Sequence, residues 1–167
     1  EVFNFAETRA ELEKRGHNFR SNSDTEVIAN AYEEWGDECM HHFRGMFALL
    51  IWDTKAQRLF AARDRLGIKP LYWAETSQGL ILGSELKALL ASGYIQPELN
   101  LEALNYYLAF YSVPSPLTML VGVHALPPGH CLSWDADTKR ADVRQYWDVP
   151  PARPIRADET EIRNELR

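Results

Sequence analysis

The sequence has few cysteines, no long hydrophobic segment and no excess of positive charge, and each shortage excludes a class of protein. Its two cysteines, Cys39 and Cys131, cannot form the disulfide framework of a small secreted domain, so we expect a cytoplasmic location. The longest apolar run, Met46 to Trp52, is far too short to span a bilayer. The formal net charge of −6 argues against a nucleic-acid backbone or an anionic membrane surface. We therefore expect neither nucleic acid nor membrane among the partners.

The residues that are present suit a packed globular protein. Of the 167 residues, 46% are hydrophobic and 25% are charged, which is enough apolar material for a core. The length suits one domain with a piece of another. The first residue is Glu1 rather than an initiator methionine, and residues 1–5 already have the pattern of the inside of an element. This start indicates a fragment of a longer protein.

Helical patterns dominate the first quarter of the chain. Asn4 and Glu7 have the spacing of a capping box, in which each side chain bonds the other's free backbone N–H. Ser23 and Asp24 both suit the start of a second helix, and Gly36 suits its end. The predicted helices are Ala6 to Arg15, Ser23 to Trp35, Glu38 to Phe43, Leu86 to Ala91 and Asn100 to about Tyr111.

Apolar runs joined by polar turns predict β-hairpins with largely buried strands. The runs are Met46 to Trp52 with Leu59 to Ala62, Lys69 to Ala74 with Leu80 to Gly83, and short strands between Gly122 and Tyr146. Strict alternation of strand and helix is absent, which disfavours a doubly wound parallel sheet. The order of elements predicts an α+β fold in which two sheets pack face to face with helices outside.

Four stretches of the sequence carry a joint signal: Ser23-Asp24-Thr25-Glu26, Arg44-Gly45-Met46-Phe47-Ala48, Arg63-Asp64-Arg65-Leu66-Gly67-Ile68-Lys69-Pro70-Leu71-Tyr72 and Ser84-Glu85-Leu86-Lys87-Ala88-Leu89, with support from Leu126-Pro127-Pro128-Gly129-His130 and Tyr146-Trp147-Asp148. In this order and spacing they resemble class II glutamine amidotransferases, specifically the asparagine synthetase branch. Each stretch alone is a weak signal, but the ordered set is specific and covers essentially the whole chain.

The resemblance implies the N-terminal-nucleophile hydrolase fold, a four-layer αββα sandwich of two antiparallel sheets, here truncated at its N-terminus. It divides the chain into a partial glutaminase domain at residues 1–148, a linker at 149–157 and the first helix of a synthetase domain at 158–167. Pro150, Pro151 and Pro154 make that linker stiff.

The chemistry that the resemblance implies begins at an N-terminal cysteine. In the family its thiolate attacks the side-chain amide of glutamine, with the α-amino group as base. An Asn-Gly pair just before a Glu forms the oxyanion hole. Glu1 matches that Glu, and Asp24 matches the Asp that binds the α-ammonium group of glutamine. The nucleophile and the Asn-Gly pair are expected upstream of Glu1, so this chain holds no catalytic residue and should be inactive alone.

The resemblance also implies the partners. They are glutamine and a downstream synthetase domain, where ATP and Mg²⁺ activate aspartate; no cofactor is expected in this chain, and a homodimer stays open. Two other functions remain: a non-catalytic binding or scaffold domain on the same fold, and a glutaminase domain that serves another acceptor. The encoded sequence immediately upstream of Glu1 would separate enzyme from scaffold.

The residues also have structural interpretations. Asp24 can be a helix cap, and Glu1 can be a solvated chain end. Arg63, Asp64, Arg65 and Lys69 suit a structured loop in which Asp64 pairs with a neighbouring arginine, with a contribution to a domain interface, better than a phosphate site.

The remaining polar candidates point to no chemistry of their own. Ser84 and Glu85 suit a strand-to-helix junction, with Ser84 as cap, better than a nucleophile with its acid. Cys39 and Cys131 are expected to be buried and inert. The pair His41-His42 suits a solvated helix face, and no metal site is expected.

Overall fold

The computed structural model describes residues 1–151 and residue 163. Its helices are α1 (Phe5–Lys14), α2 (Asp24–Trp35), the short 3-10 helix η1 (Gly36–His42), α3 (Leu86–Ala91) and α4 (Leu101–Phe110). Its strands are β1 (Ala48–Asp53), β2 (Arg58–Arg63), β3 (Tyr72–Thr76), β4 (Gly79–Gly83), β5 (His124–Ala125), β6 (His130–Asp135) and β7 (Arg140–Gln145). Most of the predicted linker, and the predicted helix at 158–167 apart from Arg163, lie outside the described residues.

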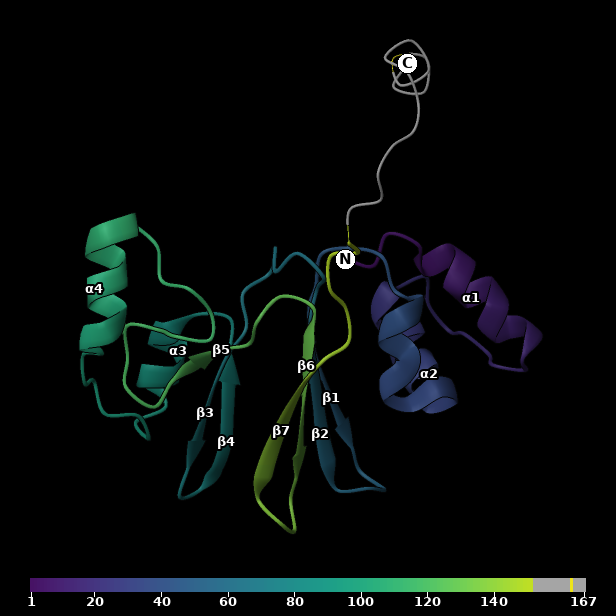
Figure 1. Ribbon diagram of the computed structural model, residues 1–167. Coiled ribbons are helices and arrows are strands. Elements are labelled where there is room, and N and C mark those ends of the chain that lie inside the picture. The colour runs from purple at the N-terminus through teal and green to yellow at the C-terminus, as the bar shows by residue number, and fades with distance from the viewer. Residues whose placement is uncertain (152–162, 164–167) are drawn as a thin grey trace.

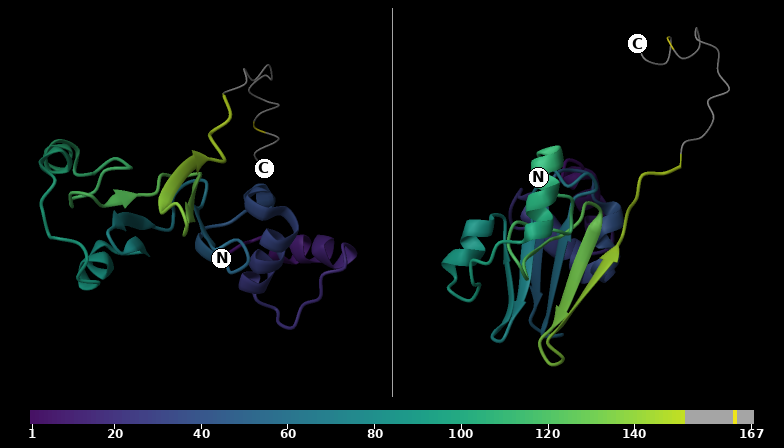
Figure 2. Two further views of the ribbon diagram at one scale, coloured as in Figure 1. Left: turned by 90° about the horizontal axis from the view of Figure 1, so that it is seen from below. Right: turned by 60° about the vertical axis from the view of Figure 1, so that its left-hand side comes forward.

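The strands form two antiparallel sheets. One has the order β1-β2-β6-β7 and the other the order β4-β3-β5. Figure 1 shows the two sheets side by side, with α1 and α2 outside the first and α3 and α4 outside the second. Figure 2 shows the same layers from two other directions. This arrangement confirms the predicted α+β sandwich of two antiparallel sheets between helices.

Three hydrophobic clusters fill the spaces between the four layers. The first joins α1, α2 and η1 to the four-stranded sheet through residues such as Leu12, Val27 and Phe60. The second lies between the sheets and contains Ala61, Leu71, Leu126 and Leu132. The third, with Ala74, Leu89 and Val123, holds α3 against the three-stranded sheet. These clusters bury apolar side chains from both sheets and from α1, α2, η1 and α3.

The predicted capping box at the start of α1 is wrong. The amide of Asn4 donates to the carbonyl of His42 at 2.9 Å, and its oxygen accepts from the backbone N–H of Arg44 at 2.8 Å. Glu7 bonds the guanidinium of Arg44 at 2.6 Å instead of reaching back to Asn4. Segments distant in the sequence thus replace the local partners, while the helix itself forms where the pattern predicts it.

The starts of the later helices follow the sequence in two cases and depart from it in one. Ser23 caps α2, because its side chain accepts from the N–H of Thr25 at 3.1 Å. Asn100 caps α4 by accepting from two backbone N–H groups. The predicted cap at Ser84 is wrong: Glu85 stands at the N-cap of α3 and makes no side-chain cap bond.

Strand β1 pairs with β2 in the predicted hairpin, from Ala48 opposite Arg63 to Asp53 opposite Arg58. Its predicted burial is only partly correct. Leu49 faces the helices and is buried, whereas Leu50 and Trp52 on the other face are about half exposed. The physical reason is position, because β1 is the edge strand of the first sheet and the second sheet has fewer strands with which to cover it.

The loop after β2 is ordered as predicted, but by different bonds. The buried carboxylate of Asp64 accepts from the backbone N–H groups of Phe47, Leu66, Ile68 and Lys69, at 2.9 to 3.3 Å. No arginine pairs with Asp64 among the described interactions; Arg63 instead donates to the carbonyls of Gly67, Lys69 and Leu126. The predicted Asp–Arg pair is therefore wrong, because the turn of the backbone brings its own amides to the carboxylate.

Candidate functional site

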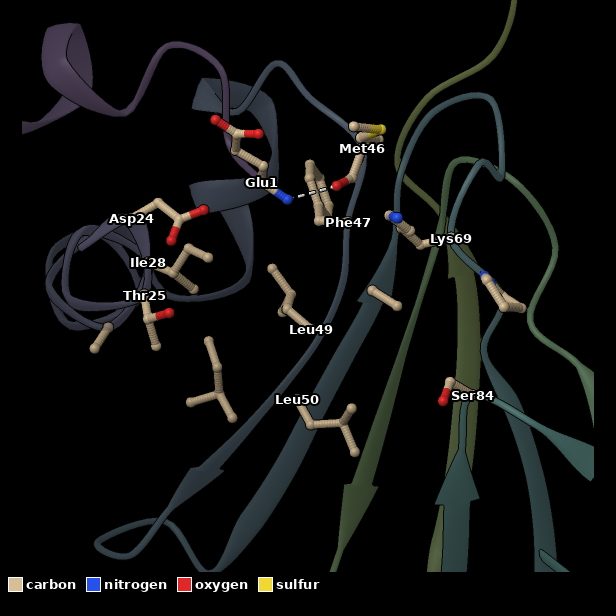
Figure 3. A pocket seen from close by; sticks show the side chains of 14 residues that line it. Glu1, Asp24, Thr25, Ile28, Met46, Phe47, Leu49, Leu50, Lys69 and Ser84 are labelled. Carbon is tan, nitrogen blue, oxygen red and sulfur yellow. Dashed lines mark hydrogen bonds between the residues drawn. The ribbon is translucent and has the colours of Figure 1, made fainter. Parts of the chain in front are cut away.

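An open pocket of about 710 Å³ lies between the start of α2 and strand β1. Figure 3 shows Glu1 and Asp24 on one side of it and Lys69 and Ser84 on the other. The structure thus brings together the two residues that the sequence singles out, although they are 23 positions apart in the sequence. The pocket is lined by Glu1, Asp24, Thr25, Ile28, Ala29, Met46, Phe47, Ala48, Leu49, Leu50, Ile51, Lys69, Pro70 and Ser84.

Asp24 is the first residue of α2, and its side chain is not the cap of that helix. Ser23 fills the cap, so the Asp24 carboxylate is available for other contacts. Its Oδ2 accepts from the backbone N–H of Val2 at 3.1 Å. A negative charge at this position interacts favourably with the positive end of the helix dipole. Asp24 therefore offers a fixed negative charge at the wall of the pocket, which suits an ammonium group.

Glu1 is held beside Asp24 by the segment that precedes β1. The α-amino group of Glu1 donates to the carbonyl of Met46 at 2.7 Å, and its carbonyl accepts from the N–H of Met46 at 3.1 Å. Val2 and Gly45 form an antiparallel bridge. A Cβ atom at Gly45 would lie 2.3 Å from the carbonyl oxygen of Glu1. Gly45 is required here because the two backbones approach so closely.

The far side and the apolar lining of the pocket were not identified as functional from the sequence. Lys69 comes from the loop after β2, and Ser84 follows β4, so only the packing of the sheets places them opposite Asp24. Met46, Leu49 and Leu50, from β1 and the segment before it, make much of the remaining lining apolar. Thr25, Lys69 and Ser84 all stand in stretches that carry the family resemblance, which is the signal that could have marked them, but no local pattern gives any of the three a binding role.

The pocket joins two acidic residues, a lysine and an apolar lining, which is chemistry for binding a small zwitterion. Neither cysteine nor histidine lines it. Cys39 and Cys131 are both buried in the core beside the four-stranded sheet, as predicted. Burial raises the pKa of the Cys39 thiol to about 12 and also raises the pKa of Cys131. Both remain protonated near neutral pH and are poor nucleophiles.

The other polar candidates have structural partners. The ring of His42 stacks on Trp35 with centroids 3.7 Å apart, and His41 lies 3.2 Å from Glu38. Within residues 1–151 and 163, no group of three or more His, Cys, Asp or Glu side chains is placed to hold a metal ion. In the same residues, no helix is both long and apolar enough to cross a membrane.

The comparisons with known proteins agree with the fold and the motif set. A family model described as "Glutamine amidotransferase domain" matches residues 1–147. Asparagine synthetase [glutamine-hydrolyzing] 3 of Bacillus subtilis is 37% identical over 150 residues, covering 89% of this chain and 24% of the relative. Asparagine synthetase [glutamine-hydrolyzing] 1 of the same organism is 34% identical over 169 residues, covering 100% of this chain and 26% of the relative. The chain spans about a quarter of the length of these relatives.

Solved structures support the fold. The glutamine phosphoribosylpyrophosphate amidotransferase of B. subtilis, in complex with ADP and GMP, superimposes with a TM-score of 0.60 over 87% of this chain and 27% of its own. The sequence identity is 18%, so this likeness concerns the arrangement of the sheets and helices alone.

Proposed function

The chain belongs to the glutamine amidotransferase domain family, and from that premise we propose that it is the glutaminase part of a glutamine-dependent asparagine synthetase. The proposal places glutamine in the pocket between α2 and β1. In the intact protein, the ammonia released there would be transferred to aspartate activated by ATP and Mg²⁺ in a downstream synthetase domain. The two free, buried cysteines suit a cytoplasmic location, which we include in the proposal.

The observation that carries the proposal is the convergence of Glu1 and Asp24 in one pocket. With Ser23 as the cap, the Asp24 carboxylate keeps Oδ1 without a described hydrogen-bond partner. We propose that this oxygen accepts from the α-ammonium group of glutamine. A charge-assisted hydrogen bond of this kind orients a substrate as well as binding it.

The rest of the pocket suits the remainder of glutamine. The apolar side chains of Met46 and Leu49 match its methylene groups. Glu1, beside Asp24, would contact the side-chain amide end or the residues that bind it. These roles make the pocket a binding surface, and the covalent step needs a nucleophile from elsewhere in the intact protein.

We propose that the nucleophilic cysteine and the oxyanion donors precede Glu1 in the longer protein. The described pocket contains no thiol, and the two buried thiols have raised pKa values. The 167-residue chain alone should then bind glutamine weakly or not at all and should not hydrolyse it.

The test is an assay of the longer protein beside the chain alone. The longer protein should release glutamate from glutamine and form asparagine when aspartate and ATP are supplied. The chain alone should release no glutamate. Failure of the longer protein to hydrolyse glutamine would favour a non-catalytic scaffold and would end the proposal.

A second acceptor is favoured by one relative. Amidase chry2 of Gibberella zeae is 34% identical over 149 residues, covering 89% of this chain. This relative is named as an amidase rather than an asparagine synthetase, and we propose as the alternative that the domain serves an acceptor other than aspartate. Glutamine hydrolysis that is insensitive to aspartate, with no asparagine formed, would favour this alternative.

A further inference from the structure

A separate pocket of about 400 Å³ lies among α3, α4 and the three-stranded sheet. Part of its wall comes from residues 111–123, which lead from α4 back to β5 (Figure 1). Among the described residues, it shares no lining side chain with the pocket that we propose for glutamine. Small-molecule sites have volumes of roughly 300–1,000 Å³, so this pocket is large enough to hold a ligand.

Arg63 gives this pocket a positive charge. Its guanidinium donates to the backbone carbonyls of Gly67, Lys69 and Leu126 at 2.7 to 2.8 Å, and it makes no ion pair with a described carboxylate. A guanidinium has more N–H donors than these bonds use. No described Asp or Glu lines the pocket, although the whole chain has a formal net charge of −6. The pocket therefore suits an anionic group.

Hydroxyl-bearing side chains share the lining with Arg63. They are Tyr72, Tyr107, Ser112 and Ser115, and none of their hydroxyls has a hydrogen-bond partner among the described residues. Each hydroxyl can donate to an oxygen of a ligand, and such a bond is stronger when the acceptor is charged. These donors add to the preference for an anionic, oxygen-bearing group.

The rest of the lining is apolar and partly aromatic. Leu86, Leu117 and Met119 contribute aliphatic side chains. The rings of Tyr107 and Tyr111 meet edge to face, with centroids 6.2 Å apart. Aromatic rings pack well against other flat apolar groups. A free inorganic ion would gain nothing from this part of the pocket, so the ligand should combine an anionic group with a flat apolar body.

Tyr111 stands in the pocket wall with an unusual backbone conformation. It ends α4 with φ of 54° and ψ of 23°, in the left-handed region that favours glycine or asparagine. Its side chain is 84% exposed, so core packing does not account for a tyrosine here. Strained residues of this kind are concentrated at ligand sites. Tyr111 therefore suits contact with a ligand better than a structural role.

We propose that this pocket binds a small molecule with a flat apolar body and one anionic group, a carboxylate or a phosphate. The anionic group lies beside Arg63 and accepts from its free N–H groups and from the hydroxyl of Tyr72. The flat body packs between Leu86 and the rings of Tyr107 and Tyr111. The inference does not rest on the proposed function, because the glutamine pocket contributes no residue to it.

The two pockets are nevertheless joined through one side chain. Nε of Arg63 donates to the carbonyl of Lys69 at 2.8 Å, and Lys69 lines the pocket that we propose for glutamine. A ligand bound at Arg63 is therefore one hydrogen bond away from that pocket.

The first test is calorimetric titration of the longer protein with phenyl phosphate, benzoate and benzamide. We expect at least one of the two anions to bind with a Kd below about 1 mM. Neutral benzamide should bind at least about tenfold more weakly, because it gains little from the charge of Arg63. The anion that binds more tightly identifies the charged group. Absence of binding by both anions, or equal binding of benzamide, would overturn the proposal.

The second test separates ligand contact from structural support. Tyr111→Gly should weaken binding of the better anion by about tenfold or more, because the ring is lost. The melting temperature should hold or rise, since glycine accepts a positive φ without strain. The matched control is Gln57→Gly, which replaces a residue with φ of 49° in the turn between β1 and β2 and should leave Kd unchanged.

Unchanged binding in Tyr111→Gly, or equal weakening in both variants, would contradict the assignment of the pocket. Tyr107→Ala repeats the measurement if Tyr111→Gly does not fold. Failure of the proposed function would appear as absent glutamine hydrolysis, which leaves these binding constants unaffected.

Discussion

Replacing Asp24 by asparagine in the longer protein separates substrate binding from helix capping. The cap of α2 is Ser23, so Asp24→Asn leaves it intact. The carbonyl oxygen of an asparagine can still accept from the N–H of Val2, as Oδ2 of Asp24 does at 3.1 Å. The substitution therefore removes a charge from the pocket and little else.

The expected loss follows from the bond that the charge would make. A hydrogen bond between charged groups is worth about 1.5–3 kcal/mol. At about 1.4 kcal/mol per factor of ten, kcat/KM for glutamine should fall by roughly 10- to 100-fold. Loss of a favourable charge at the helix start should lower stability by only about 0.3–1 kcal/mol.

The assay is the ratio of glutamine-driven to ammonia-driven asparagine formation. Ammonia bypasses the pocket, so its reaction should persist in Asp24→Asn. The matched control is Ser23→Ala, which removes the cap and should cost about 1 kcal/mol of stability. In that control both reactions should fall together or not at all. An Asp24→Asn protein with the wild-type ratio would refute a role for Asp24 in binding glutamine.

Four further outcomes are expected. Gly45→Ala should weaken glutamine use and lower the melting temperature, because the new Cβ would lie 2.3 Å from a backbone oxygen; wild-type values would contradict the close approach. Asp64→Asn should lower the free energy of unfolding, measured in urea, by about 2–3 kcal/mol, because an NH₂ group would replace one of the two oxygens that accept from backbone N–H groups. A loss under about 0.5 kcal/mol would argue against the role of the Asp64 hydrogen bonds in ordering the loop after β2. Cys39 should resist alkylation at pH 8 until the protein unfolds, as its pKa is raised to about 12; mass spectrometry of the native protein would reveal early modification. The hydrogen bond between His17 and Glu34 raises the pKa of His17 above 6.5 and lowers the pKa of Glu34 below 4.5. The pair therefore stabilises the folded protein between pH 4.5 and 6.5, and this contribution is lost as the pH rises through the raised pKa of His17. His17→Ala should lower the melting temperature more at pH 5.5 than at pH 8.5.

The sequence predicts the layers of the fold well, because periodicity is a local property. The helical spacing of Val27 and Ala31 indicates both a helix and the face that it buries, and the apolar run at β1 indicates a strand. Antiparallel hairpins follow from short polar turns between such runs. The likeness to a known family adds Glu1 and Asp24 as candidates, and the shared pocket is consistent with that pairing while their binding of glutamine stays a prediction.

Contacts between distant segments determined the features that the sequence did not predict. Asn4 bonds η1 and Arg44 rather than Glu7, because folding brings stronger or better placed partners to it than its neighbours in the helix. The half-exposed face of β1 depends on where the second sheet ends, which no pattern within β1 records.

The sequence by itself determined which segments become helices and strands, that the sheets are antiparallel, and that Ser23 or Asp24 begins α2. Only the tertiary structure assigned the cap to Ser23 and so left the Asp24 carboxylate open to the pocket. It alone set Lys69 and Ser84 opposite that carboxylate. The physical reason is range: backbone propensity and hydrophobic period act over a few residues, whereas a binding site forms where packed layers bring distant side chains together.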